Sequence, residues 1–271
     1  MDETLDIRNE ILRKVEWKRV TAAIFVDEEG IISGITSAKE EASKLGLSVL
    51  EMVPEGGEVR KGGEVIRFSG TPKQIVMAEE ILIGLMAKSS GIATQAHKFV
   101  KATGGKPKIV CGAWKKMPPP LKDMIREAVI AGGASSRIEP HPFAYLDKNY
   151  VELLGGIKKS LEAVASLSHV SKVVQVRGRY QDIVSEACEA AESGAHTVFI
   201  DSGKPDDVRR IGERLRQLGL REKVKIAFGG GVNLEAIGEL KALDIDILDI
   251  GRQIVDAPLL DMRLEIIEVE G

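Results

Sequence analysis

Two glycine clusters near the C-terminus have the residue types and spacing of phosphate-binding turns. Residues 226–233 read IAFGGGVN and residues 247–252 read ILDIGR, so that each short apolar run ends in glycine before a helical pattern. Glycine leaves the turn without a side chain, and backbone N–H groups can then converge on an anion at the positive end of a helix. Alternatively, the glycines only close two turns. We favour phosphate because such sites often follow the last two strands of an α/β barrel. The expected binding residues are Gly229, Gly230, Gly231, Gly251 and Arg252.

Charged residues follow the other apolar runs. In a barrel, the residues at the carboxyl ends of the strands face one mouth. Several cations that face the glycine turns there favour a polyanionic ligand, such as a sugar with several phosphates. Asp201, directly after residues 198–200, is a candidate to hold Mg²⁺, which prefers oxygen ligands. The expected cations of the mouth are Lys115, Lys116, Arg137, Lys148, Arg177 and Arg179.

Ordinary structural roles stay open for several of these residues. Lys115 and Lys116 fit solvated loop charges equally well, and Lys122 lies on a helical pattern, where surface exposure is the commoner fate. The four histidines share no metal-ligand spacing. Cys111, at the end of an apolar run, is typical of a core residue and not of a nucleophile.

Composition narrows the class of protein. A 271-residue chain that is 44% hydrophobic can form one barrel-sized domain or two smaller ones. The net charge of -3 does not indicate a nucleic-acid surface. There is no secretory leader pattern, and no apolar run reaches the roughly 18 residues of a membrane span. Two distant cysteines favour a reduced, cytoplasmic setting.

The pattern of elements changes along the chain. Residues 1–104 combine an amphipathic stretch over 1–16, short β runs with glycine turns, and a helical pattern from Pro72, which predicts an N-terminal α/β sandwich domain with linking helices. Residues 105–258 repeat strand and helix without hairpins, which predicts an open, incomplete parallel α/β barrel. Residues 259–271 alternate like an edge strand that returns to the first domain.

The segment Ser-Gly-Ile-Ala-Thr at residues 90–94 resembles the quinolinate phosphoribosyltransferase (nicotinate-nucleotide pyrophosphorylase) family, and the resemblance extends over most of the chain. Residues 115–122 (KKMPPPLK) stand in the place of the family's Arg-Lys-Thr-Thr-Pro-Gly-Leu-Arg loop. Residues 199–202 (FIDS) match Met-Leu-Asp-Asn, and residues 229–232 (GGGV) match Ser-Gly-Gly-Ile. Residues 249–261 match the family's Ser-Val-Gly-Ala through Val-Pro-Ala-Leu-Asp without a gap. The resemblance implies a type II phosphoribosyltransferase fold.

The resemblance also implies roles for individual residues. Lys115, Lys116 and Lys122 would line an anionic site, with Arg137 retained from the family's Asn-His-Arg segment. Lys115, Lys116, Arg137 and Lys148 would hold pyrophosphate and the acceptor carboxylate. Asp201 would be the carboxylate on the metal side, and the glycine turns would hold the 5-phosphate.

Departures from the family pattern fall in the pocket for the acceptor base. Ser136 stands where the family has histidine, and Asp147 stands where it has lysine, with Lys148 displaced by one position. Glu80 aligns with an arginine that the partner subunit supplies to a quinolinate carboxylate. An arginine attracts a quinolinate carboxylate, whereas a glutamate in its place repels it. The glutamate of the family's strand has no clear counterpart, although Arg177 adds positive charge.

The resemblance implies an enzyme, a Mg²⁺-dependent pentosyltransferase of NAD biosynthesis. It would form nicotinate mononucleotide from quinolinate and 5-phosphoribosyl-1-pyrophosphate, releasing pyrophosphate and CO₂. One alternative is the same fold acting on nicotinate or another aromatic acid, which Glu80 and Ser136 favour. Another is a phosphosugar-binding relative without catalysis. A homodimer or an assembly of dimers is expected, with neither nucleic-acid nor membrane partners.

Overall fold

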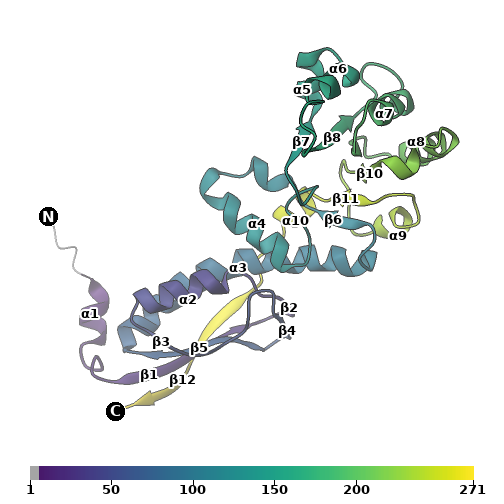
Figure 1. The fold of residues 1–271 in the computed structure, drawn as a ribbon. Helices are drawn as coiled ribbons and strands as arrows, with labels where there is room; N and C mark the ends of the chain where they lie inside the picture. Colours follow the sequence, from purple (N-terminus) through teal and green to yellow (C-terminus); the bar gives the residue numbers. More distant parts are fainter. Residues whose placement is uncertain (1–5) are drawn as a thin grey trace. The chain divides into compact units, whose positions relative to one another are not determined.

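The computed structural model describes residues 6–271, which form two units (Figure 1). The sheet unit comprises residues 6–97, Pro118–Gly133 and Asp256–Gly271. The barrel unit comprises Lys98–Met117 and Ala134–Val255. The expected amphipathic stretch over 1–16 contains a single short helix, α1 (Ile7–Leu12), and residues 1–5 lie outside the described part of the chain. Among the described residues, no helix is both long and apolar enough to cross a membrane.

The sheet unit is built on a four-stranded antiparallel sheet in the order β12-β1-β5-β3. Its strands are β1 (Arg19–Val26), β3 (Ser48–Met52), β5 (Glu64–Gly70) and β12 (Met262–Glu270). A two-stranded sheet of β2 (Gly30–Ile31) and β4 (Glu58–Val59) completes the unit. The C-terminal strand β12 pairs with β1 along its whole length, so the chain returns to its first strand.

Helices cover the core side of this sheet. They are α2 (Ile35–Lys44) and the first part of α3 (Pro72–Thr103), and α4 (Lys122–Ala131) also belongs to the unit. Alternate residues of β1 point into the core, where Ile24, Phe68 and Leu82 are fully buried. The sequence predicts a strand over residues 30–35, but β2 ends at Ile31. Glu55 accepts the N–H groups of Gly34 and Ile35, both at 3.0 Å, and so begins α2 there.

The motif at residues 90–94 lies inside α3 and fixes this helix within the sheet unit. The Ser90 hydroxyl accepts the N–H of Ser33 at 3.0 Å, and the Thr94 hydroxyl accepts the N–H of Ile31 at 2.9 Å. Ile31 is the last residue of β2, and Ser33 lies in the short segment that leads from β2 into α2. The polar residues of the motif therefore satisfy buried backbone groups that have no partner in a regular ladder.

The barrel unit contains a curled sheet of six parallel strands in the order β6-β11-β10-β9-β8-β7, which confirms the predicted open α/β barrel. Ser135 forms a bridge to Val110 at the β6 edge. The strands are β6 (Lys108–Val110), β7 (Phe143–Leu146), β8 (Ser171–Val176), β9 (Thr197–Ile200), β10 (Lys225–Phe228) and β11 (Ile247–Asp249).

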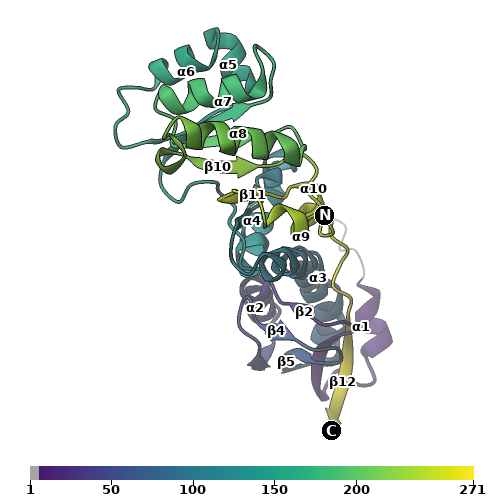
Figure 2. The same ribbon diagram turned by 90° about the vertical axis from the view of Figure 1, so that its right-hand side faces the viewer.

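Helices follow the strands as expected of a right-handed α/β repeat. They are α5 (Lys148–Leu154), α6 (Ile157–Ala163), α7 (Ile183–Glu192), α8 (Pro205–Gln217), α9 (Ile237–Leu240) and α10 (Arg252–Val255). Figure 2 shows α7 and α8 side by side. The helical patterns expected after the two glycine clusters are only four residues each. Their helix dipoles are correspondingly weak, because an isolated turn aligns few peptide units.

The interior of the half-barrel is packed with side chains. Alternate strand residues point inward and form a buried cluster of Val110, Ile138, Val173, Phe199, Ala227 and Ile247. At the amino ends of the strands, buried Glu139 accepts hydrogen bonds from Thr197 Oγ1 at 2.7 Å and Lys225 Nζ at 2.9 Å. The floor of the half-barrel is therefore closed by a hydrogen-bonded ion pair.

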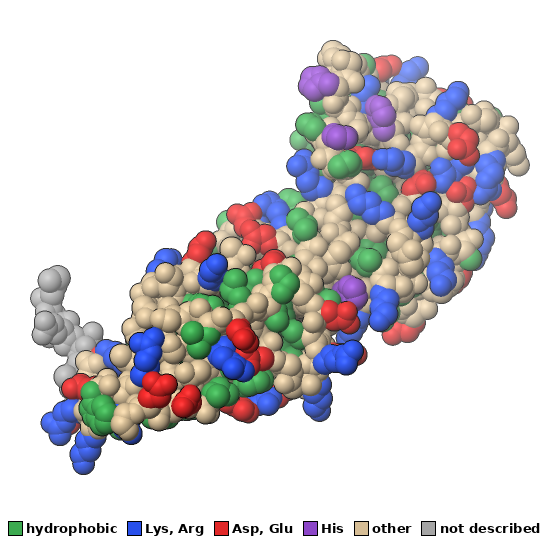
Figure 3. Space-filling model, turned by 60° about the horizontal axis from the view of Figure 1, so that its bottom comes forward, with side chains coloured by type: hydrophobic (Ala, Val, Ile, Leu, Met, Phe, Trp, Pro, Cys, Tyr) green, Lys and Arg blue, Asp and Glu red, His purple; other side chains and the backbone are tan. Residues whose placement is uncertain are grey.

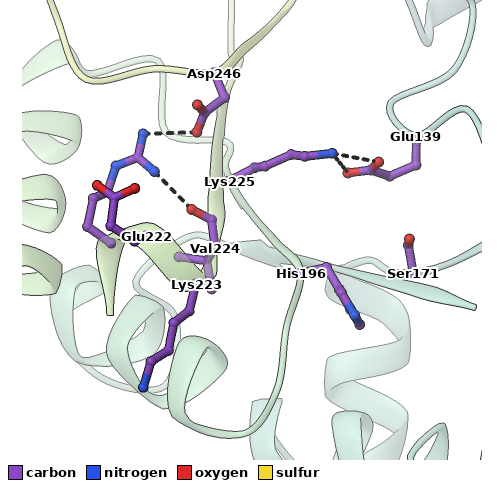
Figure 4. A pocket seen from close by; sticks show the side chains of 9 residues that line it. Glu139, Ser171, His196, Glu222, Lys223, Val224, Lys225 and Asp246 are labelled. Atoms are coloured by element: carbon purple, nitrogen blue, oxygen red, sulfur yellow. Dashed lines mark hydrogen bonds and ion pairs between the residues drawn. The ribbon is translucent and has the colours of Figure 1, made fainter. Parts of the chain in front are cut away.

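A pocket of about 350 Å³ opens beside this floor (Figure 4). Lys225 reaches across it to Glu139, and Arg221 binds Asp246 Oδ2 at 2.9 Å. Arg221 also donates to both carboxylate oxygens of Asp244, at 2.9 and 2.7 Å. The pocket is thus lined by two ion pairs, Lys225–Glu139 and Arg221–Asp246. The amino ends of barrel strands are generally associated with stability and not with catalysis.

The Arg221–Asp244 pair predicts a pH-dependent contribution to stability. The Arg221 guanidinium holds the pKa of Asp244 below its usual value. Because the folded pKa is lowered, the contribution is present above the unfolded pKa of about 3.9 and is lost as the pH falls through the folded pKa. Asp244→Asn should therefore cost about 1 kcal/mol or less in urea unfolding near neutral pH, with the difference vanishing in acid. A difference that stays constant into strong acid would contradict this assignment.

Candidate active site

The carboxyl edge of the parallel sheet brings together most of the residues predicted from strand ends. Arg177 directly follows β8, Asp201 follows β9 and Gly229 follows β10, while Asp249 is the last residue of β11. The strand register pairs Gln175 with Phe199 and Phe199 with Ala227, so these residues share the inward face. Because inward and outward residues alternate, the next inward layer contains Arg177, Asp201, Gly229 and Asp249.

Asp201 lies at the centre of a polar network on this edge. Its Oδ2 accepts a hydrogen bond from Gln175 Nε2 at 2.7 Å and lies 3.7 Å from Arg177 Nε. The amide oxygen of Gln175 accepts the N–H of Lys148 at 2.9 Å. Arg177, Asp201 and Lys204 line one open hollow of about 390 Å³. Gln175, on β8, therefore forms hydrogen bonds both to the first residue of α5 and to the Asp201 carboxylate after β9.

Asp249 is a site residue that the sequence analysis did not single out. Its Oδ1 accepts the N–H of Gly112 at 3.1 Å. Burial raises the pKa of the Asp249 carboxyl above its usual value, the nearby charge of Asp201 adds to this, and Lys115 acts in the opposite direction. Asp249 lies inside the apolar run that ends at Gly251, with buried Ile250 directly after it. A carboxylate within such a run is the signal by which the sequence marks it.

The lysines of the predicted anionic site lie on a short loop after β6. Residues Ala113–Lys116 form a 3-10 turn, and Trp114 Nε1 donates to the carbonyl of Ser136 at 2.8 Å. Lys115 Nζ lies 5.3 Å from the centre of the Tyr145 ring. Lys116 is exposed, and its charge acts on Asp249. The structure therefore places both lysines at the carboxyl edge.

Three other predicted site residues are not among the described residues in contact with Asp201. The Arg137 guanidinium lies 5.4 Å from the centre of the Phe143 ring and is exposed. Arg252 begins α10 directly after Gly251. Lys122 begins α4, which belongs to the sheet unit.

The glycines have packing reasons of their own. A Cβ on Gly230 would lie 2.5 Å from Gly203 N, and a Cβ on Gly229 would lie 3.0 Å from the Phe199 ring. The loops after β9 and β10 therefore approach each other too closely for side chains, and Gly203 N–H donates to Gly229 O at 3.1 Å. Gly231 has a φ of +95°, and a Cβ added there would meet no atom within 4 Å. Among glycines 229–231, Gly231 is therefore the one at which no neighbouring atom excludes a side chain.

The described residues include no metal-binding cluster of several side chains, and the Cys111 thiol is not activated. Among residues 6–271, no group of three or more His, Cys, Asp and Glu side chains is arranged to hold a metal ion. Burial raises the pKa of the Cys111 thiol to about 12, which keeps it protonated at neutral pH. On the face drawn in Figure 3, Lys and Arg side chains are interspersed with Asp and Glu.

Solved structures share this architecture of a parallel half-barrel and an antiparallel sheet. The nicotinate-nucleotide pyrophosphorylase of Pyrococcus furiosus matches with a TM-score of 0.81 at 24% identity, over 97% of this chain and 73% of that one. The enzyme of the same name from Francisella tularensis matches with a TM-score of 0.80 at 20% identity, over 96% and 94%. The fold is therefore that of this class of phosphoribosyltransferase.

The sequence matches the family described as quinolinate phosphoribosyl transferase, with the N-terminal domain over residues 6–90 and the C-terminal domain over residues 92–265. A probable nicotinate-nucleotide pyrophosphorylase (carboxylating) of Archaeoglobus fulgidus is 30% identical over 256 residues, which cover 94% of this chain and 97% of that protein. The chain belongs to the quinolinate phosphoribosyltransferase family, whose members are pentosyltransferase enzymes.

Proposed function

We propose that this protein transfers the phosphoribosyl group of 5-phosphoribosyl-1-pyrophosphate to quinolinate, forming nicotinate mononucleotide and releasing pyrophosphate and CO₂. The observation that carries the proposal is the cluster of Lys115, Lys148, Arg177 and Asp201 at the carboxyl edge of the half-barrel, in a member of this family. A concave site with several cations around one carboxylate suits an anionic phosphosugar and an anionic acceptor.

Glycosyl transfer develops positive charge on the sugar and negative charge on the departing pyrophosphate. The protein has to orient the acceptor and stabilise both charges. In the proposed reaction Lys115 and Lys116 neutralise the pyrophosphate, Lys148 and Arg137 hold the acceptor carboxylate, and the Asp201 carboxylate favours the developing cation. The glycines 229–231 and Gly251 take the 5-phosphate through backbone N–H groups.

A magnesium ion fits this arrangement through Asp201. The contacts of this carboxylate to Gln175 and Arg177 both involve Oδ2, which leaves Oδ1 for an ion in the hollow that Asp201 lines. Mg²⁺ is commonly held by one or two carboxylates, with substrate phosphates and water as the other ligands. The ion would add positive charge at the pyrophosphate. Magnesium dependence and a homodimer are both parts of the proposal.

A second acceptor, nicotinate, is favoured by one specific observation. Glu80 is exposed on α3 at the position where the resemblance implies an arginine for a quinolinate carboxylate. An acceptor with a single carboxylate needs one clamp fewer.

The products test the proposal. Purified protein with phosphoribosyl pyrophosphate, Mg²⁺ and quinolinate should yield nicotinate mononucleotide, pyrophosphate and CO₂ in equal amounts, and a chelator should stop all three. Nicotinate mononucleotide formed from nicotinate without CO₂, and none from quinolinate, would support the second acceptor. A phosphosugar that stabilises the protein against heating without any product would support a binding protein instead.

A further inference from the structure

The loop between β8 and α7 is held by one buried carboxylate. Glu186, in the first turn of α7, is 2% exposed. Its Oε2 accepts the N–H groups of Arg177 at 2.9 Å and Gly178 at 2.7 Å, and its Oε1 accepts those of Arg179 at 2.7 Å and Tyr180 at 2.9 Å. A carboxylate is costly to bury unless hydrogen bonds compensate it, and four N–H donors do so here. The loop backbone is therefore fixed to the helix.

The loop that Glu186 fixes carries two arginines into the candidate site. Arg177 and Arg179 line a hollow of only about 10 Å³ together with Lys148, Gln175 and Glu186 itself, and such a volume holds about one water molecule. Arg177 also lines the hollow of Asp201. Within the described part of the chain, the Arg179 and Lys148 side chains form no ion pair, while Arg177 faces Asp201. Because Arg177 lines both hollows, these cations adjoin the larger one of about 390 Å³, which has room for an anion.

The position of this hollow separates it from the expected phosphate turns. Lys148 follows β7 and Arg177 follows β8, whereas Gly229 and Gly251 follow β10 and β11. Asp201, after β9, stands between the two sides. Because the expected phosphate turns lie on the β10–β11 side, the arginines of the β7–β8 side are left for the acceptor, whose carboxylate matches the guanidinium fork.

We propose that Glu186 is a positioning residue that fixes residues 177–180, so that Arg177 and Arg179, with Lys148, bind a carboxylate of the aromatic acceptor. This inference rests on the proposed phosphoribosyl transfer. Glu186 acts only through the loop, and it contacts neither substrate. Pre-organised arginines bind with less loss of conformational freedom than arginines on a mobile loop.

Glu186→Gln tests the inference, because the amide keeps the shape but turns an NH₂ group toward two N–H donors. The KM for the acceptor should rise on the order of 10- to 100-fold, while the KM for phosphoribosyl pyrophosphate stays within about twofold. Hydrogen exchange should show faster exchange of the amides of residues 177–180. Glu192→Gln, which changes an exposed carboxylate on the same helix, should leave both KM values unchanged.

Gly178→Ala displaces the same loop without a change of charge. Gly178 has φ +67, and a Cβ would lie 3.3 Å from Ile183 Cβ. Gly178→Ala tests the inference if Glu186→Gln does not fold. It should also raise the KM for the acceptor. An unchanged acceptor KM in a folded variant whose loop amides exchange faster would overturn the inference, as would a rise confined to phosphoribosyl pyrophosphate. A wild-type protein that releases pyrophosphate with no acceptor at all would instead overturn the proposed function, and the inference with it.

Discussion

Lys116→Ala is expected to lower kcat/KM for pyrophosphate release by about two to three orders of magnitude, the loss seen when one pre-organised charge or donor is removed from a developing anion. Lys116 ends the short turn after β6, and its charge acts on the half-buried Asp249. Its side chain is exposed and forms no ion pair within residues 6–271. The free energy of unfolding should therefore change by no more than about 0.5 kcal/mol.

Steady-state kinetics of the Lys116→Ala variant measures the loss in kcat/KM, and thermal unfolding of the same preparation measures its stability. Lys158→Ala is the matched control, because Lys158 is an exposed lysine on α6 away from the strand ends. It should match the wild type in rate and stability. Full activity of Lys116→Ala would remove this lysine from the site and would contradict the role that the resemblance implies for it.

Gly91→Ala is expected to destabilise the sheet unit strongly, by about 3 kcal/mol, because overpacking forces the backbone to move. Gly91 lies in α3, and a Cβ there would lie 1.9 Å from the carbonyl oxygen of Pro258. Both residues belong to the sheet unit. The obstacle is backbone, which cannot move aside as a flexible side chain can. Urea unfolding followed by circular dichroism measures the loss.

Gly84→Ala provides the control within the same helix. A Cβ on Gly84 meets nothing within 4 Å. Alanine at an exposed helical position should stabilise α3 by roughly 0.5–1 kcal/mol, because it removes the conformational freedom of glycine. If both variants changed stability by the same amount and sign, close packing against Pro258 could not be the reason for glycine at position 91.

The barrel was predictable from the sequence because its signal is local and repeated. Each short apolar run followed by a helical pattern marks one strand, and parallel strands must end at a common edge. That rule alone groups Arg177 with Asp201 although they lie on different strands. The residues of 90–94 also marked the helix correctly, but a glycine in a helical pattern does not show which backbone comes close to it.

The parts that sequence reasoning missed depend on contacts between distant residues. Nothing in the spacing of Glu186 shows that it accepts four N–H groups from the preceding loop. The approach of Gly230 to Gly203 likewise appears only when two loops lie side by side. Asp249 was passed over because the resemblance aligned it with serine, and the family pattern therefore gave no carboxylate at this position beside the lysines.

The most direct test of the proposed function is the ratio of kcat/KM for quinolinate and nicotinate, measured by pyrophosphate release with phosphoribosyl pyrophosphate and Mg²⁺ as the only other reagents. We predict release with quinolinate, at least about tenfold more efficient than with nicotinate, since a second clamped carboxylate is a charge-assisted contact. Release with nicotinate alone, or with neither acid, would contradict the proposal that this family member uses quinolinate.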